Sequence, residues 1–204
     1  SGHFEKSKQS AFETDKSSED QESALIDTDG DGDLDLIVTS GSNEFADKDP
    51  ALKVRLYLND GKGNFTRAGT KQFPDLLVNG QCIEAFDADG DKDLDLFIGG
   101  RLVGGQYGTS AGSKLLINQA GTFTDQTKSL ASALDKLGMV TDAVSDDIDK
   151  DGDIDLVVVG EWMKPTILLN DGKGKLTAKE IEEAGSGLWW TIEKGDFDND
   201  GDSD

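Results

Sequence analysis

The sequence predicts an all-β protein built from repeated four-stranded antiparallel units. An acidic segment of nine residues recurs four times, as DTDGDGDLD (27–35), DADGDKDLD (87–95), DIDKDGDID (147–155) and DFDNDGDSD (196–204). Short apolar runs, rich in β-branched residues, stand at constant places around each segment and are too short for helices. The segments start 60, 60 and 49 residues apart, which is the length of one four-stranded blade of a β-propeller.

Each unit is predicted to contain four strands, A to D, in an antiparallel meander. Strand A precedes the acidic segment, at 24–26, 82–86 and 188–192, and strand B follows it, at 34–38, 94–98 and 154–159. Strand C begins at 54, 114 and 166 and leads through Asn-Asp-Gly-type turns into strand D at 63–66, 121–124 and 174–177. This connectivity places the A-to-B and C-to-D connections at one end of the sheets and the B-to-C and D-to-A connections at the other.

The repeat divides the chain into five parts. These are the end of a preceding blade with a linker (1–20), blade 1 (21–80), blade 2 (81–138), blade 3 (139–187) and the start of a further blade (188–204). GHF at 2–4 resembles GNF at 63–65, so the first residues are predicted to be strand D of the preceding blade. Three complete blades and two partial ones cannot close a ring of about four to eight blades. We therefore expect a fragment of a larger propeller, with its remaining blades elsewhere in the full-length chain.

Composition and charge exclude several classes of function. The chain has 42 acidic and 20 basic residues and a net charge of -22, which argues against binding nucleic acid or an anionic membrane surface. No apolar run approaches the roughly 18 residues of a membrane span, so direct membrane insertion is not expected. The single histidine, His3, argues against a Ser-His-Asp triad or a multi-histidine zinc site. The single cysteine, Cys82, cannot form an intramolecular disulfide and is predicted to be a buried core residue.

The acidic segments are predicted to be calcium loops, with three to four ions in the chain. Five carboxylates in nine residues repel one another unless a cation lies among them, and oxygen ligands favour calcium. Side chains at positions 1, 3, 5 and 9 are the predicted ligands: Asp27, Asp29, Asp31 and Asp35; Asp87, Asp89, Asp91 and Asp95; Asp147, Asp149, Asp151 and Asp155; Asp196, Asp198, Asp200 and Asp204. The predicted position-7 ligands are the backbone carbonyls of Asp33, Asp93, Asp153 and Asp202.

Two features of these loops refine the prediction. Position 6 is glycine in the first, third and fourth loops but Lys92 in the second, which predicts that the second site is the weakest. An EF-hand is excluded, because position 12 holds Val38, Ile98 or Val158 in a strand-like run instead of the required glutamate. The alternative is a charged surface turn without metal. Four segments with aspartates at matching positions favour the metal site.

The loops, with the following LDLIV (34–38) and LYLNDGKGNFT (56–66), resemble FG-GAP or VCBS repeats, as in the propellers of integrin alpha-subunits. GLWW (187–190) and VVVGEWM (157–163) are further similar to bacterial members that are secreted or attached to the cell surface. The resemblance implies calcium-binding blades, an extracytoplasmic location in a bacterium and a role in adhesion, glycan handling or assembly.

Two functions remain open from the sequence. The preferred one is a non-catalytic, calcium-stabilised module that binds a protein or glycan at the end opposite the calcium loops. Aromatic side chains beside polar ones suit such binding, and the candidates are Arg101, Tyr107, Glu161, Trp162 and Trp189, with Trp190 adjacent. The tryptophans could instead pack between blades.

The alternative function is a carbohydrate-active enzyme, a polysaccharide lyase or hydrolase, on the same scaffold. It would use Glu161, Glu44 or Asp47 together with Arg101 or Tyr107. Glycoside hydrolysis needs two carboxyl groups about 5 to 10 Å apart, and no spacing in the sequence shows such a pair. No catalytic residue is therefore assigned.

Overall fold

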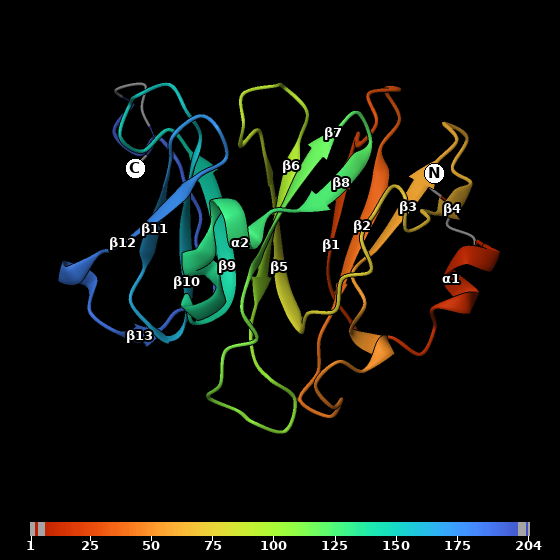
Figure 1. Ribbon diagram of the computed structural model, residues 1–204, viewed down its shortest axis with the longest axis horizontal. Helices are drawn as coiled ribbons and strands as arrows, with labels where there is room; N and C mark the ends of the chain where they lie inside the picture. Colours follow the sequence, from red (N-terminus) through yellow and green to blue (C-terminus); the bar gives the residue numbers. More distant parts are fainter. Residues whose placement is uncertain (1–2, 4–6, 200–202, 204) are drawn as a thin grey trace.

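Three antiparallel β-sheets follow one another along the chain in the computed structural model (Figure 1), which describes residues 3, 7–199 and 203. The first sheet contains β1 (Asp20–Ile26), β2 (Asp35–Ser40), β3 (Arg55–Asn59) and β4 (Phe65–Arg67), in that order. The second contains β5 (Gly80–Phe86), β6 (Asp95–Gly100), β7 (Lys114–Gln119) and β8 (Thr122–Asp125). The third contains β9 (Met139–Asp146), β10 (Asp155–Met163), β11 (Thr166–Asn170) and β12 (Leu176–Glu180), with β13 (Gly187–Leu188) also paired to β10.

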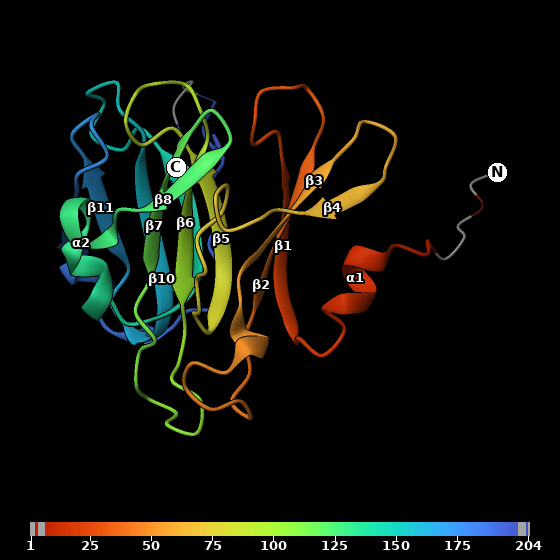
Figure 2. The same cartoon turned by 45° about the vertical axis from the view of Figure 1, so that its right-hand side comes forward.

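This architecture confirms the predicted all-β fold of four-stranded antiparallel units. Each sheet is a meander, and the first strands β1, β5 and β9 lie next to one another, as the blades of a propeller do (Figures 1 and 2). Within the described residues the three sheets do not close into a ring. The fold is therefore propeller-like.

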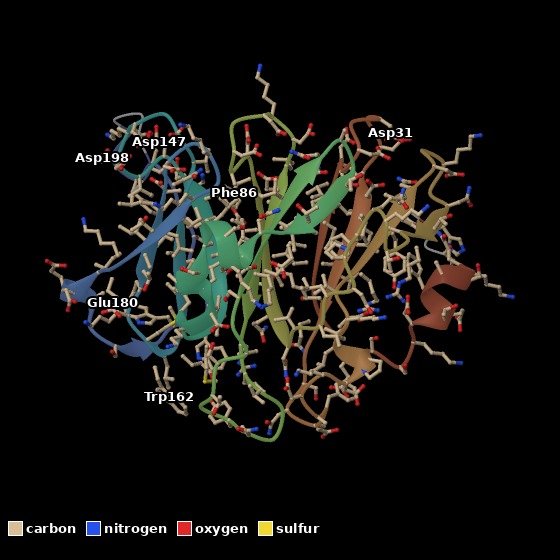
Figure 3. The ribbon with its side chains drawn as sticks, viewed as in Figure 1. Asp31, Phe86, Asp147, Trp162, Glu180 and Asp198 are labelled. Atoms are coloured by element: carbon tan, nitrogen blue, oxygen red, sulfur yellow. The ribbon has the colours of Figure 1, made fainter. Side chains whose placement is uncertain are left out.

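The connections between strands lie at two opposite ends of the sheets. The acidic segments join β1 to β2, β5 to β6 and β9 to β10, at the same end as the β3–β4, β7–β8 and β11–β12 turns (Figure 1). Figure 3 labels Asp31 and Asp147 at this end and Trp162 at the other. The loops 41–54, 101–113 and 164–165 connect the second strand of each sheet to the third, at the end that carries Trp162.

Two hydrophobic cores hold the three sheets together. Successive residues of a strand point to opposite faces of the sheet, so one strand can serve both cores. In β6, Leu96 and Ile98 enter the core between the first and second sheets, and Phe97 enters the core between the second and third. All three side chains are fully buried. Because both faces of the second sheet are covered, its two central strands, β6 and β7, are apolar at consecutive positions instead of alternating with polar residues.

Short helices complete the fold. They are α1 (Ser10–Thr14), η1 (Pro50–Leu52), α2 (Thr127–Leu130), η2 (Ser132–Lys136) and η3 (Glu182–Ala184), where η denotes a 3-10 helix. Among the residues that the structure describes, no helix is both long and apolar enough to cross a membrane.

Helix α1 lies in the part predicted to be a linker and packs beside β4 (Figure 2). The ring of Phe12 contacts the rings of Tyr57 and Phe65, at centroid distances of 5.1 and 5.6 Å. Gln9 accepts a hydrogen bond from the Phe65 amide at 2.8 Å, which covers part of the edge of β4. The strand predicted at 2–4 falls largely on residues that the structure does not describe.

Acidic side chains join the first strands of neighbouring sheets. Glu22 of β1 accepts a hydrogen bond from the Ile83 amide of β5 at 3.0 Å. Glu84 of β5 accepts one from the Ser145 amide of β9 at 2.9 Å. Partial burial, with the nearby Asp142 and Glu84 carboxylates, raises the pKa of Glu22. These contacts satisfy backbone amides at a place where the sheets face each other without a β-ladder.

The same type of contact recurs where one predicted strand is not formed in full. A strand was expected at 188–192, but β13 ends at Leu188 and extends the third sheet instead of starting a new one. Beyond it, the Thr191 hydroxyl and the Ile192 amide both donate to Asp142, at 2.8 and 3.0 Å. The Ile192 amide makes the same contact as the Ile83 amide of β5, so residues 189–192 hold the place of a first strand. They pair in no ladder among the described residues, so the prediction of a strand through Ile192 was wrong.

Buried asparagines link the sheets at the end that carries the acidic loops. Asn118, near the end of β7, donates from Nδ2 to the Thr28 carbonyl of the preceding sheet at 2.9 Å. Asn170, in the equivalent place of the third sheet, donates to the Ala88 carbonyl at 2.9 Å. Asn59 occupies the same position of the first sheet and donates to Leu34 within its own sheet. Two of three equivalent residues therefore bind across a sheet interface.

We expect Asn118→Ala to lower the free energy of unfolding by about 2 kcal/mol, because it leaves buried carbonyl groups without their donor. Asn170→Ala should cost less than Asn118→Ala, because the Ala88 carbonyl keeps the Gly174 amide as a donor. Asn59→Ala is the matched control, since this more exposed residue makes no bond between sheets among those described, and it should cost no more than about 1 kcal/mol. Urea unfolding at constant calcium concentration measures all three, and equal losses would show that the inter-sheet bonds are not the cause.

Candidate functional site

The first six residues of each of the first three acidic loops fold around the carboxylates of that loop. Asp27, at position 1, accepts hydrogen bonds from the amides of Gly30 and Gly32 at 2.9 and 3.0 Å. The side chain at position 3, Asp29, accepts from Asp31 two residues later at 3.3 Å. Equivalent bonds recur around Asp87 and Asp89 in the second loop and around Asp147 and Asp149 in the third. The three described loops therefore share one backbone arrangement.

The aspartate at position 9 is buried and joins its loop to the third strand. Asp95 accepts from the Ala88 amide through Oδ2 and from the Asn118 amide through Oδ1, both at 2.7 Å. Burial is the main cause that raises the pKa of Asp95 to about 6. Asp35 and Asp155 make the same pair of backbone contacts in the other two sheets, and the Thr28 hydroxyl also donates to Asp35.

Carboxylate oxygens converge in each described loop. Three oxygens lie within 4.8 Å of one another in each of the sets Asp27, Asp29 and Asp31; Asp87, Asp89 and Asp95; Asp147, Asp149 and Asp155. Burial, followed by repulsion from the neighbouring carboxylates, raises the pKa of Asp29, Asp89 and Asp149. A hard cation among the oxygens would remove this repulsion, so the donor set fits calcium.

The aspartate at position 7 contacts the turn between the third and fourth strands. Asp93 accepts a hydrogen bond from the Ala120 amide at 2.7 Å. The carboxylates of Asp33 and Asp153 occupy the space where a Cβ of Gly61 or Gly172 would stand, so both turn positions require glycine. The backbone carbonyl at position 7 is the predicted metal ligand, and the side chain serves to hold the adjacent turn.

The second loop differs at position 6. Lys92 has φ +77°, whereas Gly32 and Gly152 occupy the equivalent positions with φ +89° and +99°. A Cβ at either glycine would meet no atom within 4 Å, so a side chain costs backbone energy without causing a clash. In the fourth loop, Asp200, Gly201, Asp202 and Asp204 lie outside the described residues, so its arrangement stays a prediction.

At the opposite end, four of the predicted ligand-binding residues lie together. Arg101 Nη2 donates to the buried carboxylate of Glu161 at 2.7 Å, and its Nη1 donates to Gln81 at 3.2 Å. The Tyr107 ring meets the Trp162 ring edge to face, with 5.1 Å between centroids. The neighbouring Glu161 carboxylate raises the pKa of Tyr107. The second and third sheets thus contribute to one aromatic and charged cluster.

The adjacent residues Trp189 and Trp190 differ in burial and in their contacts. Trp190 is exposed, and the Arg101 guanidinium lies 5.3 Å from the centre of its ring, a cation–π distance. Trp189 is half-buried, and its backbone carbonyl accepts a hydrogen bond from Thr141 at 2.7 Å. Trp190, which the sequence placed only beside the predicted set, is therefore the tryptophan that contacts Arg101.

Residues that the sequence did not single out line a polar hollow of about 380 Å³ beside Arg101 and Tyr107. They include Ser42, Asn43, Asn79 and Gln81. Loops 41–54 and 101–113 meet here, where the Gly105 amide donates to both oxygens of Asn43 at 3.1 Å. Gly104 is required at this contact, because a Cβ would overlap the Phe45 carbonyl oxygen. Amide side chains in irregular loops leave no periodic signal in a sequence, which is why these residues were missed.

Burial distinguishes the remaining candidate residues, which are Cys82 and the carboxylates considered for the enzyme alternative. Cys82 is buried in the core between the second and third sheets, as predicted, and burial raises its pKa well above the usual thiol value. Glu44 and Asp47 lie exposed in loop 41–54, whereas Glu161 is buried and paired with Arg101.

The fold and its repeated acidic loops define a class of all-β repeat proteins with propeller-like sheets. A family model described as FG-GAP-like repeat matches residues 27–98 and 147–204, which is more than half of the chain. The chain belongs to this FG-GAP-like repeat family, which confirms the resemblance seen in its sequence.

No curated protein matches the chain. Among solved structures it is similar to an Agrocybe aegerita lectin, whose structure concerns specific recognition of non-reducing terminal N-acetylglucosamine. The two are 21% identical with a TM-score of 0.45, over 78% of this chain and 37% of that chain.

We expect Lys92→Gly to raise the free energy of unfolding by about 1 kcal/mol, because glycine adopts positive φ without the cost of a Cβ. It should also strengthen calcium binding at the second loop by removing an ammonium group near the ion. Lys92→Ala is the matched control, since it removes the charge but keeps the Cβ. Urea unfolding and calcium titration separate the two effects, and equal stabilisation by both variants would exclude the backbone as the cause.

Proposed function

We propose that this chain is a calcium-stabilised, non-catalytic propeller module that binds a protein or glycan at the end opposite its acidic loops. The observation that carries the proposal is the convergence of three carboxylate oxygens in each of three loops with the same backbone arrangement. A charged surface turn has no need of such convergence, because repulsion between the carboxylates makes it unfavourable without a cation.

Four sites are proposed, and the residues that would hold the ions are the predicted ligands at positions 1, 3, 5, 7 and 9. In the second and third loops the position-9 carboxylate belongs to the cluster of oxygens, and in the first loop the position-5 carboxylate does. A carboxylate oxygen has two lone pairs, so Asp95 can bind an ion while it accepts its backbone hydrogen bonds. The bound ion would supply positive charge that holds the carboxylates together.

A structural role for the ion is supported by what the loops touch. The Thr28 and Ala88 carbonyls, at position 2 of the first two loops, accept the inter-sheet bonds from Asn118 and Asn170. The Gly174 amide also donates to the Ala88 carbonyl at 2.8 Å. An ion that holds these loops in shape would therefore strengthen the contacts between neighbouring sheets.

The binding role rests on the opposite end, where loops of variable length carry exposed aromatic side chains beside polar ones. Loops 41–54 and 101–113 are long, and 164–165 is short, as is usual where a regular scaffold presents variable loops for recognition. We propose an extracytoplasmic location in a bacterium, with further blades completing a ring. Extracellular calcium modules bind with Kd of about 10⁻⁴–10⁻³ M, which suits calcium loops as exposed as these.

Calcium removal should lower the melting temperature, because an ion that binds only the folded chain stabilises it by about 2.7 kcal/mol per site at 100 times its Kd. Thermal unfolding is measured with EDTA and then with excess calcium, which should restore the transition. The control is a variant that combines Asp27→Ala, Asp87→Ala and Asp147→Ala, whose response to calcium should be strongly reduced. A melting temperature of the wild-type chain that does not change with calcium would contradict the structural role.

The non-catalytic assignment has its own test. Incubation of the calcium-loaded chain with polysaccharides should release no reducing ends and no unsaturated sugar products, because Glu161, the candidate carboxylate beside Arg101 and Tyr107, is buried and paired with Arg101. Release of either product would favour the enzyme alternative, and Glu161→Gln would then be the first variant to assay.

A further inference from the structure

The ion pair between Arg101 and Glu161 contains polar atoms that have no hydrogen-bond partner among the described residues. Glu161 has no exposed side-chain surface, and its Oε1 accepts from Arg101. The other carboxylate oxygen, Oε2, and the Nε of Arg101 are both buried and have no hydrogen-bond partner among the described residues. Unpaired buried polar atoms are unfavourable. Because Glu161 lies beneath the surface, the part of this pair that a ligand can contact is the Arg101 guanidinium, whose side chain is 24% exposed. Its N–H groups are donors that suit the hydroxyl oxygens of a sugar.

The backbone next to this pair is held in a conformation that exposes an aromatic ring. Trp162 has φ +55°, which is rare for a bulky residue, and 56% of its surface is exposed. It is the extra residue of a β-bulge, because Glu161 and Met163 pair with the consecutive residues Leu188 and Gly187. Such strain is typical of functional positions, where a bulge directs a side chain to solvent.

The Trp162 ring belongs to a larger aromatic surface. Tyr107, 54% exposed, meets it edge to face, and a Cβ at Gly108 would lie 3.3 Å from the ring. Trp190, 59% exposed, lies against the Arg101 guanidinium. In Figure 3 the labelled Trp162 projects from the end of the sheets beyond the strands. Exposed rings that are held by neighbours stack well on the apolar faces of sugar rings.

The charge of the surroundings selects the kind of sugar. Arg101 is the cation that lines the polar hollow, and Glu161 neutralises it, while Glu19 adds a negative charge that has no ion pair among the described residues. The remaining polar lining consists of amide and hydroxyl side chains, including Asn43, Asn79 and Ser42. An anionic glycan would meet no unpaired cation there and would approach a chain of net charge -22. A neutral glycan meets hydrogen-bonding groups and no repulsion.

We propose that the surface formed by Tyr107, Trp162, Trp190, the Arg101–Glu161 pair and the adjoining hollow binds a neutral glycan. The sugar rings stack on the aromatic side chains, and their hydroxyl groups bind the amide groups of the hollow and the Arg101 guanidinium. Glu161 is a positioning residue, because it lies beneath the surface and orients Arg101. The inference gives a ligand class to the binding role proposed above and depends on that role.

Affinity gel electrophoresis tests the ligand class directly. The calcium-loaded chain is run through gels that contain neutral galactomannan, xyloglucan, arabinoxylan or mixed-linkage β-glucan, and through gels that contain anionic alginate or polygalacturonate. We expect retardation by at least one neutral polysaccharide and none by the anionic ones. Retardation by none of the neutral polymers, or by the anionic ones alone, would overturn the proposal.

The variant Trp162→Gly tests the binding site without lowering the stability of the fold. Glycine relieves the positive φ, so the melting temperature should stay at or above that of the wild type, while affinity for the retarding polysaccharide falls at least about tenfold. Tyr107→Ala should weaken binding to a similar degree. Leu25→Ala is the matched control, since this side chain is equally exposed, at 56%, and belongs to β1 of the first sheet. Wild-type affinity in Trp162→Gly, or equal loss in Leu25→Ala, would refute the site.

The two proposals fail in distinguishable ways. Calcium-dependent melting without retention by any neutral polysaccharide would leave the calcium-stabilised module standing and remove the glycan site. Retention by a neutral polysaccharide together with a calcium-independent melting curve would do the reverse. Specific retention followed by cleavage would keep the site and replace the binding role with catalysis.

Discussion

Asp35, Asp95 and Asp155 each accept hydrogen bonds from two backbone amides, one at position 2 of their own loop and one at the end of the third strand. The two oxygens of one buried carboxylate thereby set the distance between loop and turn. The neighbouring sheet depends on the same contact, because the asparagine whose amide donates to Asp95 or Asp155 also donates its side chain to the preceding loop. Loop shape, strand pairing and sheet packing are coupled through this one residue type.

A buried carboxylate without a cation partner is unfavourable, and the raised pKa of Asp95 reflects its cost. A calcium ion at each loop would offset that cost at the point where three elements of structure meet. The ion would then stabilise the interface between sheets as well as the loop. The two hydrophobic cores lie on opposite faces of the second sheet.

The opposite end carries fewer such constraints, and there the chain shows strain and exposed rings. Trp162 has positive φ and a largely exposed ring, whereas the residues around it in β10 are buried. The Arg101–Glu161 pair provides a rigid polar base between the second and third sheets. The end with the repeated acidic loops and the end with the exposed aromatic side chains are therefore separated by the length of the strands. The loops at the aromatic end can vary without altering the acidic loops that hold the sheets together.

The sequence by itself determined the four-stranded unit, the place of most strands and the phase of the acidic loops, because these depend on local spacing, apolar periodicity and residues that accept positive φ. It could not show that Asp95 is buried while Asp91 is not, since both have the same chemistry and only packing separates them. Likewise, the pairing of Arg101 with Glu161 and the end of β13 at Leu188 were decided by the tertiary structure. Contacts between residues distant in the chain, and competition for the same backbone donors, arise only once the sheets are packed together.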